Sequence, residues 1–123
     1  MFGRNKKSAN SYDNQYRILC LEAKRARNKI KKLTTDIFII QNTIPIFLDG
    51  NEKNKITSKC KSLQYKLDLA IPTYEFKVDK VKDYWIKFHY QFEKYAKFNP
   101  NYYFVPAVEV IEKTVKSLYL RRK

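Results

Sequence analysis

Apolar side chains recur at alternating steps of three and four residues through most of the chain. In the first long stretch they are Tyr16, Leu19, Ala23, Ala26, Ile30, Leu33, Ile37 and Ile40. Residues spaced in this way lie on one side of an α-helix, because the helix has 3.6 residues per turn. The pattern therefore predicts a first helix over residues 12–42. We expect Pro45 and the turn at Asp49-Gly50-Asn51 to end it.

The same spacing continues after this turn and is interrupted by a proline. The apolar positions are Ile56, Cys60, Leu63, Leu67 and Ala70 before Pro72, and Val78, Val81, Trp85, Phe88, Phe92 and Tyr95 after it. Because a residue before proline is pushed out of helical dihedrals, we expect a boundary at Ile71 and two helices, over 53–71 and 74–98. Thr73 would cap the second of these, with Glu75 in its first turn. Pro106 suits the first turn of a last helix over 106–121.

Four amphipathic helices joined by short connections predict an all-α fold, an antiparallel four-helix bundle. Only two Gly and four Pro occur in the 123 residues, fewer turn residues than an all-β domain of this size needs. The length corresponds to a single domain, which we place at residues 12–123. Residues 1–11 carry Arg4, Lys6 and Lys7 without periodic apolar residues, so a flexible basic tail is expected there.

The charge is strongly positive, with 26 Lys and Arg against 12 Asp and Glu and a formal net charge of +14. Ordinary solubility needs a magnitude of only about 2–8 for a small domain. Self-repulsion at this level weakens the compact state unless an anionic partner offsets it. Nucleic acid is the favoured partner, while an anionic membrane surface, an acidic protein and a merely soluble surface remain open. No run approaches the roughly 20 apolar residues of a spanning helix, so no membrane insertion is expected.

The positive charge is concentrated towards the two ends of the sequence. Residues 1–35 carry ten positive and two negative charges, residues 36–79 six of each, and residues 80–123 ten and four. The candidate phosphate contacts are Lys24, Arg25, Arg27, Lys29, Lys31 and Lys32 in the first helix, and Arg121, Arg122 and Lys123 at the C-terminus. First and last helices are often neighbours in an antiparallel bundle, so both sets could form one surface that neutralises a phosphate backbone.

Aromatic side chains offer a second kind of contact. Trp85, Phe88, Phe92 and Tyr95 lie on the apolar stripe and are expected to pack in the core. Tyr102, Tyr103 and Phe104 fall in the last connection instead. They could stack on nucleobases, form a protein interface or cover the end of the bundle.

The sequence contains no set of residues that indicates catalysis. His89 is the single histidine and is expected to be solvated or hydrogen-bonded, and two cysteines with one histidine cannot complete a Cys₂His₂ zinc site. Gly3 and Gly50 are the only glycines, which excludes a glycine-rich phosphate loop. We therefore predict no enzyme activity, no cofactor and no metal. Cys20 and Cys60 are expected to be buried thiols in a reducing, intracellular protein.

Several local runs resemble the accessory variability determinant proteins of diversity-generating retroelements. They are Ile44-Pro45 after the first helix, Cys60 in the second, Val78-Asp79-Lys80-Val81-Lys82-Asp83-Tyr84-Trp85-Ile86-Lys87-Phe88 in the third, and the Asn99-Pro100 turn into a helix with Val110, Ile111, Val115 and Leu118. The resemblance implies a non-catalytic four-helix bundle that assembles as a homo-pentamer. It also implies binding to a reverse transcriptase and its template RNA, which favours RNA over DNA.

The alternative is a structural protein, a small helical component of a ribonucleoprotein or phage particle that folds against its partners. The basic termini and the aromatic residues of the last connection would then be docking surfaces.

Overall fold

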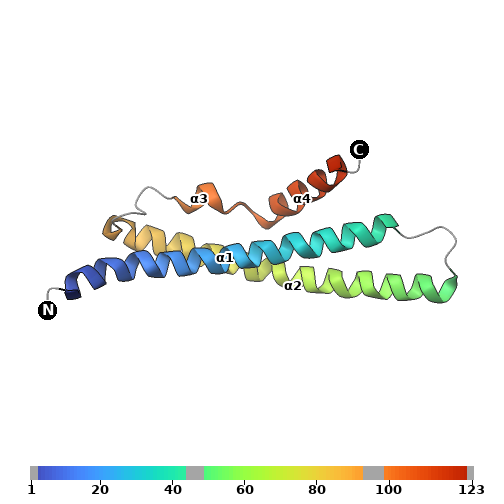
Figure 1. Cartoon of the computed structure of the whole chain (residues 1–123), viewed down its shortest axis with the longest axis horizontal. Helices are drawn as coiled ribbons and strands as arrows, with labels where there is room; N and C mark the ends of the chain where they lie inside the picture. The colour runs from blue at the N-terminus through green and yellow to red at the C-terminus, as the bar shows by residue number, and fades with distance from the viewer. Residues whose placement is uncertain (1–2, 44–48, 93–98, 122–123) are drawn as a thin grey trace.

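The computed structural model describes residues 3–43, 49–92 and 99–121, with side chains of the first range from Ser11 to Asn42. Over these residues the protein is all-α, with no strand. The elements are α1 (Gly3–Thr43), α2 (Gly50–Phe88), the 3₁₀ turn η1 (His89–Gln91), α3 (Pro100–Tyr103) and α4 (Ala107–Arg121). Figure 1 shows that α1 and α2 run antiparallel as two long rods, with α3 and α4 along one side of them.

The core lies along the seam between α1 and α2. Ala23 and Ile30 of α1 and Tyr74 and Val81 of α2 have no exposed surface. Most other positions of the predicted stripes are buried or half-buried around them. Asp49 caps α2, since its carboxylate accepts a hydrogen bond of 2.8 Å from the backbone N–H of Glu52. α1 thus includes the helix predicted at 12–42 but begins at Gly3, and it forms an antiparallel pair with α2.

The predicted break at Pro72 was wrong, because α2 continues through this residue. Burial explains the difference, since Ala70, Tyr74 and Val78 keep the stripe in phase across the proline and pack in the core. The hydroxyl of Thr73 also donates a 3.0 Å hydrogen bond to the carbonyl of Leu69, in the turn that the proline weakens. Tertiary packing therefore outweighs the local cost of the proline.

The described part of the chain consequently has three long helices where the sequence predicted four. Thr73 is a mid-helix residue rather than an N-cap, and Glu75 lies in the interior of α2. The helix predicted to extend to residue 98 ends at Phe88 and is followed by η1, and residues 93–98 lie outside the described part of the chain.

The beginning of the chain also differs from expectation, since α1 starts at Gly3. Residues 3–11, predicted to be a flexible tail, have helical backbone, while residues 1–2 lie outside the description. No proline interrupts this stretch. Once a helix is nucleated, each further residue adds a hydrogen bond at little cost, so a helix that forms along the apolar stripe can extend towards Gly3.

The C-terminal segment packs on the helix pair mainly through α1. Phe104, Ala107 and Val110 are buried in the common core. The carbonyl of Pro106 accepts hydrogen bonds from the N–H groups of Glu109 and Val110, so the last helix begins within one residue of its predicted start. As expected from the order of the elements, the first and last helices are neighbours, which brings the two basic parts of the sequence together.

Candidate nucleic-acid interface

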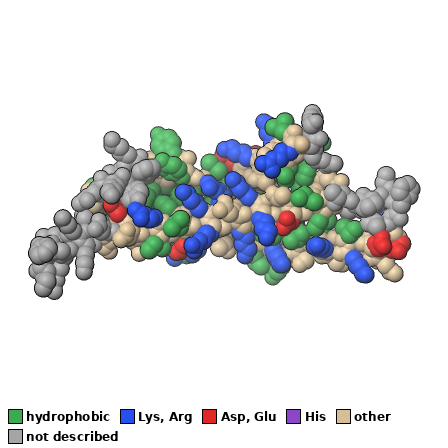
Figure 2. Space-filling model, viewed as in Figure 1, with side chains coloured by type: hydrophobic (Ala, Val, Ile, Leu, Met, Phe, Trp, Pro, Cys, Tyr) green, Lys and Arg blue, Asp and Glu red, His purple; other side chains and the backbone are tan. Residues whose placement is uncertain are grey.

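Five of the six cations predicted on the first helix are exposed on α1: Lys24, Arg25, Lys29, Lys31 and Lys32. Figure 2 shows Lys and Arg side chains gathered along the middle of the molecule over α1 and on α4 above it, with few Asp or Glu among them. No carboxylate of the described residues lies within ion-pair distance of these five side chains. Their charge is thus not neutralised within the described fold.

Arg27, the sixth of these cations, has a different environment. It is half-buried, and its Nη1 donates a hydrogen bond of 3.4 Å to the carbonyl oxygen of Tyr103. Its Nε is buried and has no hydrogen-bond partner among the described residues. Arg27 lies seven residues after Cys20 and seven before the buried Thr34, so the three residues share one side of α1. This side of α1 faces the C-terminal segment. Arg27 therefore connects α1 to α3 instead of presenting its charge fully to solvent.

A hollow of about 260 Å³ lies between α1 and α4. Three cations line it, Lys31 from α1 and Lys113 and Arg121 from α4. Thr35, Thr114 and Ser117 also line it, and the two threonine hydroxyls donate hydrogen bonds to the carbonyl oxygens of Lys31 and Val110. No Asp or Glu of the described residues lines it. We call it the hydroxyl hollow. Its three cations suit the oxygens of a phosphate group, because charge-assisted hydrogen bonds are roughly twice as strong as neutral ones.

A second hollow, of about 180 Å³, lies between α1 and the α3 region. Tyr16, Cys20, Leu21, Tyr103 and Phe104 form its mostly apolar lining, and Arg17 and Lys24 supply its cations. We call it the aromatic hollow. Loss of solvation on burial raises the pKa of the Tyr16 phenol and of the Cys20 thiol. Both groups therefore remain neutral near pH 7, and the positive charge of this hollow comes from the arginine and the lysine.

The two hollows lie along the same flank of α1. Lys24 lines one and Lys31 the other, and seven residues of helix separate them by about 10 Å. We call the surface formed by Arg17, Lys24, Lys31, Lys113 and Arg121 the α1–α4 groove.

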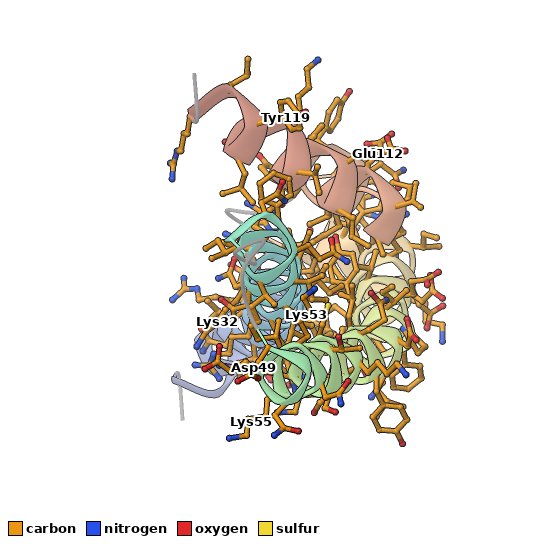
Figure 3. The ribbon with its side chains drawn as sticks, turned by 90° about the vertical axis from the view of Figure 1, so that its right-hand side faces the viewer. Lys32, Asp49, Lys53, Lys55, Glu112 and Tyr119 are labelled. Carbon is orange, nitrogen blue, oxygen red and sulfur yellow. The ribbon has the colours of Figure 1, made fainter. Side chains whose placement is uncertain are left out.

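Glu112 and Lys55 lie away from the α1–α4 groove. Figure 3 shows Glu112 of α4 on the opposite flank from Lys32 of α1. Lys55 of α2 points away from α4 in the same view. Neither Glu112 nor Lys55 lines the two hollows. The α1–α4 groove therefore includes only some of the basic residues of the protein.

Sequence reasoning identified part of this groove. Lys24, Lys31 and Arg121 were predicted and line its hollows, whereas Arg25, Lys29 and Lys32 lie outside both. Lys113 and Arg17 were missed. Lys113 precedes Ser117 and Arg121 by one and two steps of four residues, and Arg17 precedes Lys24 by seven, so helical spacing could have found both. The predicted contacts Arg122 and Lys123 lie outside the described residues.

The three aromatic residues of the last connection have different environments. Tyr102 is 82% exposed, Tyr103 is 44% exposed and Phe104 is only 3% exposed. Phe104 therefore packs mainly in the core, and only a small part of its surface lines the aromatic hollow. Tyr103, which is partly exposed, lines the aromatic hollow.

The remaining candidate groups are part of the helical framework. His89 is half-buried, its Nδ1 lies 2.8 Å from the carbonyl oxygen of Trp85, and its ring stacks on the indole at 4.2 Å. It is thus the hydrogen-bonded histidine that was predicted. Cys20 and Cys60 are half-buried and not joined in a disulfide. The described part of the chain has no group of three His, Cys, Asp or Glu that could hold a metal ion. None of its helices is both long and apolar enough to cross a membrane.

Comparison of the chain with protein-family models, with curated proteins and with solved structures found no match.

Proposed function

We propose that this protein is a non-catalytic nucleic-acid-binding protein whose α1–α4 groove holds a phosphate backbone. The observation that carries the proposal is the hydroxyl hollow, where Lys31, Lys113 and Arg121 surround one site without a carboxylate. Cations that lack an internal partner attract phosphates and release their condensed counterions. Binding would also offset the repulsion of a chain with a net charge of +14.

The sequence resemblance extends this proposal to a biological setting. An accessory subunit of a retroelement reverse transcriptase would hold template RNA in the groove while the polymerase carries out the chemistry. RNA is the nucleic acid that we propose on this basis.

Titration of labelled single-stranded RNA at several salt concentrations tests the groove. In the variant Lys24→Gln/Lys31→Gln/Lys113→Gln we expect weaker binding and a shallower dependence of log affinity on log salt. Each lost phosphate contact should reduce the slope by roughly 0.7, so the three together should reduce it by about 2.

The matched control is Lys55→Gln/Lys59→Gln/Lys66→Gln, which removes the same charge from exposed positions of α2 that line neither hollow. We expect this control to retain most of the affinity and slope. Equal losses in the two variants would show that net charge, not the groove, holds the RNA, and would contradict the proposal.

A second candidate function is a structural component of a larger particle. The observation in its favour is an apolar line on the outer side of α2, where Tyr65, Leu69 and Phe76 are each more than half exposed. Their spacing of four and seven residues places them on one side of the helix. Exposed apolar side chains on one side of a helix suit a protein interface.

A further inference from the structure

The α1–α4 groove combines two hollows of different chemistry. Among the described residues, three cations, two threonines, a serine and a leucine line the hydroxyl hollow, whereas the aromatic hollow exposes mainly apolar surface between Arg17 and Lys24. We propose that the groove selects single-stranded nucleic acid and seats one unpaired base in the aromatic hollow. This inference rests on the proposed function and names the form of nucleic acid that it would bind.

The lining of the aromatic hollow suits the flat face of a base. Tyr16 and Phe104, both nearly fully buried, form its floor. Leu21 and Tyr103 are each a little under half exposed and form its accessible sides. Base–aromatic stacking tolerates any base, because every base has a π face. The hollow would therefore hold a base without reading its identity.

The charges of the groove place the backbone beside this base. Arg17 and Lys24 are seven residues apart on α1, and both line the aromatic hollow. Phosphates on either side of a seated base would lie against these two cations, and the strand would continue towards Lys31 and the hydroxyl hollow. The same flank of α1 would thus bind the base and its neighbouring phosphates together.

A duplex cannot use the aromatic hollow. Its bases are stacked on one another, and only their polar edges reach the grooves. An apolar hollow offers few partners for those edges, so a duplex would make the phosphate contacts alone. We therefore expect single-stranded RNA to bind more tightly than duplex RNA at equal salt.

The contribution of the bases can be measured with two single-stranded oligonucleotides that have the same phosphates. One is an ordinary strand and the other has abasic residues, and their dissociation constants are compared. We expect the abasic strand to bind about fivefold more weakly or worse, since a stacked base contributes about a factor of five at least. Equal dissociation constants for the two strands would overturn the inference and leave the proposed function standing. Absence of binding by both strands would overturn the proposed function and this inference with it.

Two variants locate the base. Tyr103→Ala should weaken binding of the ordinary strand by about fivefold, leave the abasic strand unchanged and so remove the difference between them. Tyr102→Ala is the control, because this neighbour is far more exposed and does not line the hollow. Leu21→Gln, on an exposed position of α1, tests the other side of the hollow without altering α3. If the difference in affinity between the ordinary and the abasic strand persists in both Tyr103→Ala and Leu21→Gln, the base lies elsewhere and the inference is overturned.

Discussion

The phenol of Tyr74 donates a hydrogen bond of 2.8 Å to the carbonyl oxygen of Val105, and this bond joins the middle of α2 to the segment just before α4. The Tyr74 side chain is fully buried, and loss of solvation raises its pKa. The bond from Arg27 to Tyr103 fastens the same segment to α1. Together the two bonds hold α3 and α4 against the helix pair, and so they also fix one wall of the α1–α4 groove.

Removal of the Tyr74 hydroxyl should weaken this attachment. The variant Tyr74→Phe keeps the ring in the core and leaves the half-buried Val105 carbonyl without its donor. We expect the free energy of unfolding in urea to fall by about 1 kcal/mol. Tyr65→Phe, at an exposed position of the same helix, is the control and should change little. Unchanged stability in Tyr74→Phe would show that water replaces the bond.

Arg27 and Lys24 should separate stability from binding. Arg27→Gln breaks the bond to Tyr103, and we expect it to lower the free energy of unfolding by about 1–2 kcal/mol. Lys24→Gln should change stability by no more than about 0.5 kcal/mol, because the side chain is exposed. Lys24→Gln should weaken RNA binding at low salt more than Arg27→Gln does, and it should make the dependence of log affinity on log salt shallower. If Arg27→Gln unfolds no more easily than Lys24→Gln, the structural role of Arg27 is refuted.

Replacement of Pro72 should stabilise α2. Pro72→Ala restores a backbone N–H inside the helix and removes the clash with the preceding turn. We expect a gain of about 1–2 kcal/mol in the free energy of unfolding, reduced somewhat because the unfolded chain becomes more flexible. Pro72→Gly restores the same N–H but should gain about 1 kcal/mol less, owing to the low helix propensity of glycine. A less stable Pro72→Ala would mean that the core requires the proline geometry.

Alkaline pH should destabilise the fold through the aromatic hollow. Burial raises the pKa of Cys20 and Tyr16 above their ordinary values of 9.0 and 10.0. The folded state therefore holds these protons more tightly than the unfolded state, so this contribution to stability is complete below about pH 9 and is lost as the pH rises through the folded pKa values. We expect urea denaturation to show a steady loss above about pH 9. Tyr16→Phe, with one ionising group fewer, should decline less steeply than the parent protein, whereas Tyr65→Phe should follow the parent protein.

The apolar line on α2 should be covered in solution. From the resemblance of the sequence we expect a closed homo-pentamer of the 14.8 kDa chain. Light scattering at high salt, which removes bound nucleic acid, would measure the assembled mass. Phe76→Glu should dissociate the assembly, because it places a charge in the apolar interface. A monomeric parent protein would refute this prediction, and a chain that is ordered only with another protein would favour the structural role.

The sequence predicted the helices well where burial and local preference agree. The apolar stripe from Tyr16 to Ile37 predicts a helix, and in the structure it lies along the buried side of α1. At Pro72 the two conflict, and the prediction followed the proline. The steps from Ala70 to Tyr74 and from Tyr74 to Val78 are each four residues, so the uninterrupted spacing already favoured one helix. Local preference is a weak guide when a long buried stripe spans the site.

The candidate groove was only partly predictable, for a different reason. Spacing shows that Lys24 and Lys31 share a side of α1, but it does not show which segment lies beside them. The proximity of Lys113 to Lys31 depends on how α4 packs across α1. The same packing makes Arg27 a structural residue, although in the sequence it is indistinguishable from its basic neighbours.

The α1–α4 groove is built from two distant parts of the sequence, with α1 as one wall and the segment from Tyr103 to Arg121 as the other. The helix pair alone would present half of the site, so the apparent affinity for a polyanion should scale with the fraction of molecules in which the C-terminal segment is docked. Conversely, a bound strand would favour the docked form by mass action. Occupancy of the groove and closure of the chain are therefore two readouts of a single equilibrium, and hydrogen exchange in α4 would report on both.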